Sequence, residues 1–460
     1  MKVLFIAPLP PPVHGSAMVS QYIKDSRLVN EQYDCDFVNL STSRRMDEIG
    51  KGGIKKILRF IGAYLSLLWK LITRRYDLCY LAITCHGVGF LKDAPFVLLC
   101  KLFRLRVLIH QHNKGMSGCV ERWPYRWLLP LVYRNTRVML LSWHLYDDIA
   151  KVVKREQVVV CANGIPEVTM NDYRLPITDE QKVAGSMEKQ RLTINDERLT
   201  LNDNDDDNVD HTTQENLTQT AQNSQNNILE CEDQHDLDTK TQNLQVAAPL
   251  QASGAHTHPD GVSAMSAAPS LRGRAGGEAP YLLFLSNLIP SKGVYVLLDA
   301  CRVLKERGLQ FVCDFVGGET KEIDRAAFEA AVKGRDLEGI VCYHGPKYGE
   351  EKEEYWRQAD VFVQPTFDDC FPLTLVEAMQ HRLPIVSTDV GAIPDMIKEE
   401  VNGFICPQRD VDSLVTALEK LITDPVLRQQ MGEQGYQRYQ EEFTLEAFER
   451  RFVAELKGDD

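Results

Sequence analysis

Short apolar runs, each followed by a segment suited to a helix, recur in two separate stretches of this chain of 460 residues. The first run is KVLFIAP at residues 2–8, and five more follow it: DFVNL, DLCYLAIT, RVLIHQH, RVMLLS and QVVVCANG. Continuous apolar runs of this length are typical of strands buried on both faces of a parallel sheet. Their alternation with helical segments predicts an α/β domain at residues 1–165.

The same alternation returns after residue 280, with the runs YLLFLSNL, FVCDFVGG, IVCYHG, VFVQPT, PIVSTD and GFICP. It predicts a second doubly wound domain at residues 280–443. The chain then closes with LRQQMGEQGYQRYQEEFTLEAFERRFVAEL, which is typical of two helices broken near Phe443. Thr444 follows the break and is predicted to cap the last helix, because its hydroxyl can accept from a free amide.

Between the two domains, residues 166–279 have a different composition, with the acidic, Asn- and Gln-rich text LNDNDDDNVDHTTQENLTQTAQNSQNN. Aromatic residues nearly vanish here, so the segment cannot bury enough surface to offset its ordering entropy, and we predict a disordered linker. The charge is also unevenly divided: residues 1–165 hold 24 Lys and Arg against 12 Asp and Glu, whereas the whole chain carries −13. A basic first domain joined to acidic segments predicts unlike partners for the two halves, and we expect no nucleic acid among them.

The 12 cysteines are scattered without a C-x-x-C pair, which favours a reducing cytosol over a disulfide scaffold or a zinc site. No signal peptide is recognised at the start, and no apolar run reaches the roughly 20 residues that a membrane helix needs. We therefore expect a cytoplasmic protein. Gly15 follows the first strand without a G-x-G-x-x-G pattern, which counts against a nicotinamide dehydrogenase.

The segment DDCFPLTLVEAM places Asp369 and Glu377 at the two ends of an apolar stretch. Pro372 stands where a helix could begin, so the amides of Leu373 and Thr374 would be free to bind an anion at the positive helix end. Glu377 lies five residues further, roughly 7–8 Å along the axis. This spacing suits a phosphate at the helix tip with a ribose diol beside it; the alternative is an acid that offsets the helix dipole and a surface glutamate.

Four other residues point to the same edge of the two sheets, where ligands of doubly wound folds bind. Lys292 lies in the loop of NLIPSKGVYVLLDA and could bind a diphosphate, or it is a solvated loop lysine. His110 and His112 end the strand VLIHQH on one face, either as cleft residues or as hydrogen-bonded fillers, and we expect no metal there. Gly15 would let the backbone approach a phosphate closely.

Taken together, these residues resemble glycosyltransferase family 4, the retaining family with the two-domain GT-B fold. The resemblance rests on DCFPLTLVEAM with LPIVSTDVGAIPDMI and NGFICPQRD, which is similar to the family's E-x(7)-E element and its tail. SNLIPSKGVYVLLDA resembles the donor-diphosphate loop, VCANGIPEV the segment that closes the first domain, and VLIHQHNKG the cleft histidine strand. The resemblance implies two Rossmann-like domains facing a cleft, with the last helix, residues 444–457, completing the first domain.

It also implies the role of each residue. Glu377 would bind the ribose hydroxyls, Lys292 the diphosphate, His112 and Asp369 the transferred sugar, and Gly15 the phosphates or the acceptor. Phe371, Pro372, Leu373 and Thr374 would present backbone to the sugar and phosphate. The chain departs from the family at Asp369 (usually Glu), Cys370 (usually Gly) and Asn287 (usually Arg). A second diphosphate cation would then be Lys347 or Lys114, and the transfer would need neither metal nor cofactor.

The resemblance implies transfer from a UDP- or GDP-sugar to a saccharide acceptor. The basic, apolar segment at residues 51–76 and RWPYRWLLPLVYR would either face the core or lie on anionic lipid. Together with the resemblance, the second alternative implies a lipid-linked acceptor in bacterial capsule, O-antigen, exopolysaccharide or lipopolysaccharide synthesis, and a peripheral location on the inner face of the plasma membrane. Two other functions stay open: a non-catalytic GT-B-like subunit that supports a partner enzyme, and a GT-B epimerase of nucleotide sugars.

Overall fold

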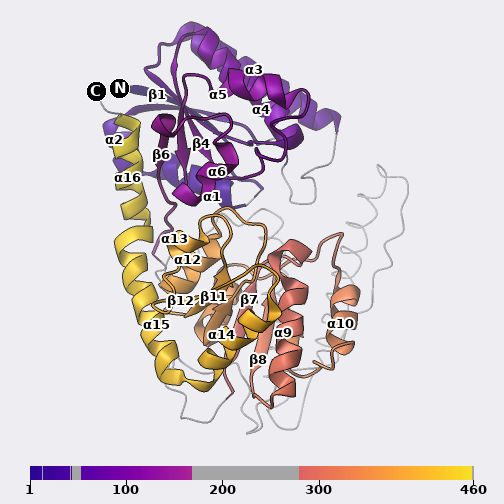
Figure 1. Ribbon diagram of the computed structural model, residues 1–460. Coiled ribbons are helices and arrows are strands. Elements are labelled where there is room, and N and C mark those ends of the chain that lie inside the picture. Colours follow the sequence, from indigo (N-terminus) through magenta and orange to yellow (C-terminus); the bar gives the residue numbers. More distant parts are fainter. Residues whose placement is uncertain (13, 42, 44–52, 168–278, 458–460) are drawn as a thin grey trace, which may run out of the picture. The chain divides into compact units, whose positions relative to one another are not determined.

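The computed structural model describes residues 1–12, 14–41, 43, 53–167 and 279–457 (Figure 1). The predicted disordered linker falls almost wholly on residues 168–278, outside this part of the chain. The described residues form two six-stranded sheets in which every strand pairs in parallel with its neighbour. The α/β architecture predicted from the alternating runs is therefore confirmed, with a strand at each of the predicted runs.

The first sheet has the strand order β2-β1-β3-β4-β5-β6. Its strands are β1 (Lys2–Ala7), β2 (Asp34–Asn39), β3 (Leu78–Ile83), β4 (Arg106–Gln111), β5 (Arg137–Leu140) and β6 (Val158–Val160). The helices of this region are α1 (Gly15–Asp25), α2 (Arg27–Gln32), α3 (Ile54–Thr73), α4 (Gly87–Leu102), α5 (Tyr125–Tyr133) and α6 (Tyr146–Ile149). The order reverses between β1 and β3, so a ligand is expected beyond the ends of these strands.

The second sheet has the order β12-β11-β10-β7-β8-β9, which is the arrangement of a dinucleotide-binding fold. Its strands are β7 (Tyr281–Leu285), β8 (Val312–Val316), β9 (Val341–Tyr343), β10 (Val361–Val363), β11 (Ile385–Thr388) and β12 (Gly403–Cys406). Its helices are α9 (Val294–Glu306), α10 (Arg325–Lys333), α11 (Gly349–Gln358), α12 (Leu373–Gln380), α13 (Ile393–Met396), α14 (Val411–Thr423) and α15 (Pro425–Arg438). The switch point lies between β7 and β10.

The last helix, α16 (Leu445–Lys457), packs on the first sheet although it follows the second in sequence, and Figure 1 shows it beside α2. Phe448 and Phe452 are buried in the same apolar cluster as Phe5 of β1. The Thr444 hydroxyl accepts from the Ala447 amide at 3.2 Å, which confirms the predicted cap. A single turn of π-helix, Tyr439–Phe443, joins α16 to α15 at the predicted break.

No helix among the described residues combines the length and the apolar content needed to cross a membrane. The helix in the basic segment, α3, instead has two different apolar faces. Phe60 and Tyr64 pack edge-on against Phe96 of α4, with ring centroids 5.4 and 5.5 Å apart. The opposite face is exposed, up to 77% at Ile54. The prediction of a core-facing helix therefore describes one face of α3 but not the other.

Candidate active site

The loop after β10 carries Asp369, the first of the two predicted acids. Its Oδ1 accepts a hydrogen bond from the Cys370 amide at 2.9 Å, and its Oδ2 lies 3.5 Å from Nε2 of Gln364. Gln364 is buried, and its Oε1 accepts from the Thr374 hydroxyl at 2.6 Å. One amide side chain therefore contacts both the acid and the first turn of α12. Sequence reasoning missed this residue because it reads as part of the apolar run VFVQPT.

Helix α12 begins at Leu373, one residue later than the sequence predicts. Pro372 is the capping residue, with the extended backbone angles φ −70° and ψ 111°, and its carbonyl accepts from Leu375 at 3.1 Å. Neither the Leu373 nor the Thr374 amide donates to an acceptor in the described part of the chain. These two donors at a helix N-terminus therefore remain available to an anion, as predicted for a phosphate.

Lys292 lies in the loop after β7. Its Nζ contacts the loop after β10 that carries Asp368 and Asp369, here called the acid loop. It donates to Oδ2 of Asp369 at 2.6 Å and to the carbonyl of Asp368 at 3.0 Å. The next residue, Gly293, has a φ of 86°, and a side chain there would collide with the Pro365 carbonyl. Glycine thus lets the two loops approach each other. Two residues predicted to contact different parts of the donor form an ion pair.

Glu377 lies one turn further along α12, and Lys352 of α11 holds its carboxylate. The Lys352 Nζ donates to both Glu377 oxygens, at 2.9 and 2.8 Å, and both side chains are less than one-third exposed. Burial and the charge of Glu377 raise the pKa of Tyr22 on α1 to about 12. Sequence reasoning also missed Lys352, because nothing in the text GEEKEEYW distinguishes it from a solvated lysine.

His110 of β4 and His112, just after this strand, lie next to each other, with ring centroids 4.0 Å apart. His112, but not His110, belongs to the lining of the cavity described next. His110 is buried one step deeper, where its Nδ1 pairs with the Tyr80 hydroxyl at 2.7 Å. The structure therefore places His110 below the cavity lining and not in it, because strand alternation fixes the face of a residue and not its depth. Burial, with His14 nearby, lowers the pKa of His112 to about 4, so its ring is neutral near pH 7.

A cavity of about 270 Å³ lies where these segments meet. Its lining comes from His14, Gly15, Ser16, His112, Asn113, Leu141, Asn163, Asp369, Cys370, Phe371 and Leu373. A side chain on Gly15 would lie 3.8 Å from the Leu373 methyl, so the N-termini of α1 and α12 are close together. Both helix ends carry partial positive charge, and the cavity is therefore suited to an anionic group. Lys292 and Glu377 do not belong to this lining. Lys292 contacts Asp369, which does, and Glu377 lies one turn along α12 from Leu373.

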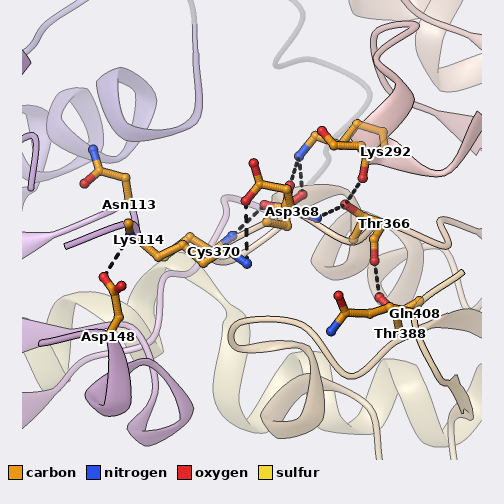
Figure 2. A network of polar contacts seen from close by, with 12 residues as sticks. Asn113, Lys114, Asp148, Lys292, Thr366, Asp368, Cys370, Thr388 and Gln408 are labelled. Atoms are coloured by element: carbon orange, nitrogen blue, oxygen red, sulfur yellow. Dashed lines mark hydrogen bonds and ion pairs between the residues drawn. The ribbon is translucent and has the colours of Figure 1, made fainter. Parts of the chain in front are cut away.

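The candidates for a second diphosphate cation are Lys114 and Lys347, and Asn287 occupies the position where the family usually has arginine. Of these three residues, only Lys114 contacts the acid loop. Its Nζ lies 3.5 Å from Oδ1 of Asp368, and Figure 2 shows Lys114 and Lys292 on opposite sides of that residue. Lys347 pairs instead with Glu351 at 3.2 Å. Asn287, which stands at the arginine position of the resemblance, accepts from the Gly318 amide at 2.9 Å and ties two loops together.

One group among the described residues has side chains that could hold a metal ion, namely Asp314 of β8, Cys342 of β9 and His344 just after β9. Their ligand atoms lie within 4.8 Å of one another, and Nε2 of His344 is 2.7 Å from Oδ1 of Asp314. None of the three lines the cavity described above. His110 and His112 do not belong to such a group within the described ranges.

Residues 272–438 match the Glycosyl transferases group 1 family. The match covers less than half of the chain. The matched part contains the loops of Lys292 and Asp369 together with Lys352 and Glu377, and therefore the whole second-sheet side of the candidate site.

Curated relatives match the chain over part of their length. The amylovoran biosynthesis glycosyltransferase AmsK of Erwinia amylovora is 33% identical over 146 residues, or 30% of this chain and 35% of AmsK. The putative colanic acid biosynthesis glycosyltransferase WcaL of Escherichia coli is 26% identical over 189 residues, or 38% of this chain and 45% of WcaL. The matched part thus spans less than half the length of these relatives.

Solved structures resemble the chain over nearly all its length. Sucrose-phosphate synthase from Thermosynechococcus elongatus has a TM-score of 0.62 at 15% identity, covering 99% of this chain and 98% of that one. Anabaena Alr3699/HepE in complex with UDP has a TM-score of 0.60 at 13% identity, covering 100% of both chains. At these identities the likeness shows the fold, which is GT-B as the resemblance implied.

Proposed function

We propose that this chain is a retaining glycosyltransferase, which moves a sugar from a UDP- or GDP-sugar to a saccharide acceptor. The observation that carries the proposal is the cavity at the N-termini of α1 and α12, bordered by the Asp369–Lys292 pair and by a neutral His112. An anionic leaving group, a sugar and an attacking hydroxyl each find suitable partners there. The group 1 domain and a neighbouring structure that binds UDP support the same reaction class.

In the proposed reaction, the bond between the anomeric carbon and the diphosphate oxygen breaks, and its electrons pass to the diphosphate. Lys292 and the amides of Leu373 and Thr374 stabilise the charge that develops there. The acceptor hydroxyl attacks the same face of the sugar and gives its proton to the departing diphosphate. Asp369 accepts a hydrogen bond from a sugar hydroxyl, and His112 contacts the sugar near its reacting carbon.

We infer further that the acceptor is a saccharide, carried on a lipid, in the assembly of a bacterial surface polysaccharide. The names of AmsK and WcaL support a role in polysaccharide assembly, since they refer to the biosynthesis of amylovoran and of colanic acid. A second cavity, of about 230 Å³, lies on the first sheet. It shares four lining residues with the first cavity: His14, Ser16, His112 and Asn113. The second cavity is where we place the acceptor sugar.

Incubation of the purified chain with UDP- and GDP-sugars provides the first test. We expect one donor class to raise the melting temperature, and sugar transfer to a saccharide acceptor to persist in full after exhaustive chelation. Loss of activity on chelation, restored by a divalent metal, would contradict the proposed chemistry. Donor binding without any turnover would favour the non-catalytic subunit, and a changed nucleotide sugar without acceptor would favour the epimerase.

We propose that the exposed face of α3 docks on anionic membranes from the cytoplasmic side. This face carries Ile54, Ile57, Leu58, Ile61, Leu65, Trp69 and Ile72. Lys55 lies at its N-terminal end, and Arg75 follows its C-terminal end. Lys70 and Arg74 contribute less than the sequence suggests, because both pair with Asp36, at 3.0 and 2.7 Å. An apolar stripe flanked by basic residues suits the boundary of headgroups and acyl chains.

We expect the chain to sediment with phosphatidylglycerol-containing vesicles and to be released by salt, since each basic residue near the surface contributes about 1 kcal/mol. The double change Ile61→Glu and Leu65→Glu should weaken binding about tenfold or more, because it removes two side chains that would enter the bilayer boundary. Val426→Glu on α15, also exposed, serves as the matched control. Equal binding of the double variant and the control would contradict docking through α3.

A further inference from the structure

We propose that Lys352 and Glu377 together form the binding site for the ribose diol of the donor nucleotide, with Lys352 donating a hydrogen bond to one ribose hydroxyl. The inference rests on the proposed function, because it extends the role of Glu377 in that site. Its basis is the contact of the Lys352 Nζ with both Glu377 oxygens, at 2.9 and 2.8 Å.

The number of donors and acceptors fits a diol. An ammonium group has three N–H donors, and the two contacts with Glu377 use two of them. No other hydrogen bond of this Nζ occurs within the described ranges. The carboxylate keeps a free lone pair on each oxygen, so it can accept from two neighbouring hydroxyls. Each hydroxyl oxygen that donates to Glu377 can itself accept, and the third N–H of Lys352 then finds its partner.

The neighbouring residues fix where Lys352 stands. The next residue on α11, Glu353, contacts Nε2 of His381 at 2.5 Å, and Nδ1 of His381 lies 2.7 Å from the Glu377 carbonyl. The His381 ring stacks on Trp356 of α11, with ring centroids 5.4 Å apart and 15° between the planes. Two consecutive residues of α11 therefore contact Glu377 and His381, the residue that follows the end of α12. This double attachment holds the ammonium beside the carboxylate before a ligand arrives.

The alternative role for Lys352 is structural: it would only orient Glu377. The two roles differ in how the lysine and the ribose hydroxyls depend on each other. If Lys352 donates to a hydroxyl, a nucleotide that lacks this hydroxyl should bind with similar affinity whether or not the lysine is present. If Lys352 acts through Glu377 alone, its loss weakens every ligand by a similar factor, whichever hydroxyl is absent.

Titration calorimetry with UDP, GDP and ADP first identifies the nucleotide that the parent chain binds. The 2′-deoxy and 3′-deoxy forms of that nucleotide are then compared in the parent, Lys352→Met, Lys352→Arg and the control Lys151→Met. Lys151 pairs with Glu121 at an exposed site away from the cavity. We expect Lys352→Met to weaken the ribonucleotide about tenfold, the value of one charge-assisted hydrogen bond, and Lys352→Arg to restore part of the loss.

The decisive result is the coupling. One of the two deoxy nucleotides should bind the parent and Lys352→Met within a factor of two, whereas the other should still lose affinity. Equal losses for all three nucleotides would overturn the inference and leave Lys352 as a support of Glu377. Parental affinity of Lys352→Met for the ribonucleotide would overturn it as well. A parent chain that binds none of the three nucleotides would instead contradict the proposed function. Where Lys352→Met does not fold, Lys352→Gln takes its place in the same comparison.

Discussion

Replacement of Lys292 by alanine should lower kcat about 100- to 1,000-fold, the usual effect of removing one donor that stabilises developing negative charge. The physical reason is that charge on the departing diphosphate grows as the glycosidic bond breaks, so the ammonium contributes more to the transition state than to the bound donor. KM for the donor should therefore change less than kcat. Steady-state kinetics with the donor identified by thermal stabilisation provide the measurement.

The loop that carries Lys292 is held by contacts of its backbone, so the alanine variant tests the side chain alone. Its loop is attached to the acid loop, because the Ser291 carbonyl accepts from the Phe367 amide at 2.8 Å and from the Thr366 hydroxyl at 3.1 Å. These contacts do not involve the lysine side chain, so the loop should keep its position in the variant. Lys305→Ala is the matched control, since Lys305 pairs with Asp336 on the same domain. A kcat within threefold of the parent would remove Lys292 from the proposed mechanism.

Replacement of Glu377 by alanine should reduce kcat/KM about 10- to 100-fold, the equivalent of 1.5–3 kcal/mol for lost charge-assisted hydrogen bonds. Here the loss should appear mainly in KM. The ribose lies away from the reacting carbon, so its contacts are similar in the bound donor and in the transition state. We thus expect mainly a lower kcat for the Lys292 variant and mainly a higher KM for the Glu377 variant. This contrast tests the two roles more strictly than either loss alone.

Two further variants show whether hydrogen bonds of the Glu377 carboxylate cause the loss in kcat/KM. Glu377→Gln keeps the size of the side chain and one acceptor, so it should lose less than Glu377→Ala if hydrogen bonds to a diol are responsible. Glu121→Ala removes the partner of an exposed lysine, Lys151, outside the site and controls for the general loss of an ion pair. If Glu377→Ala keeps kcat/KM within a factor of two, Glu377 does not bind the donor.

The local rules of the sequence were sufficient for the architecture. The apolar runs predict the strands of both sheets, because a strand buried on both faces must be apolar along its whole length. Thr444 could be recognised as a cap, and Pro372 as the start of α12 to within one residue, because both effects act over a single helical turn. The same rules placed Lys292 and Asp369 in loops at the carboxyl ends of their strands, where the switch point of the sheet lies.

Only the tertiary structure decided which of these side chains touch. Lys352 and Glu377 belong to different helices, and their contact depends on how α11 and α12 are rotated and packed on the sheet. Gln364 directly follows the apolar strand β10, yet its contacts with Asp369 and Thr374 depend on the loop that brings these two residues close to the end of the strand. His110 and His112 share a face, as period two requires, but only the strand end reaches the cavity. Sequence periodicity fixes a direction within one element, whereas the distance between elements depends on the packing of the whole domain.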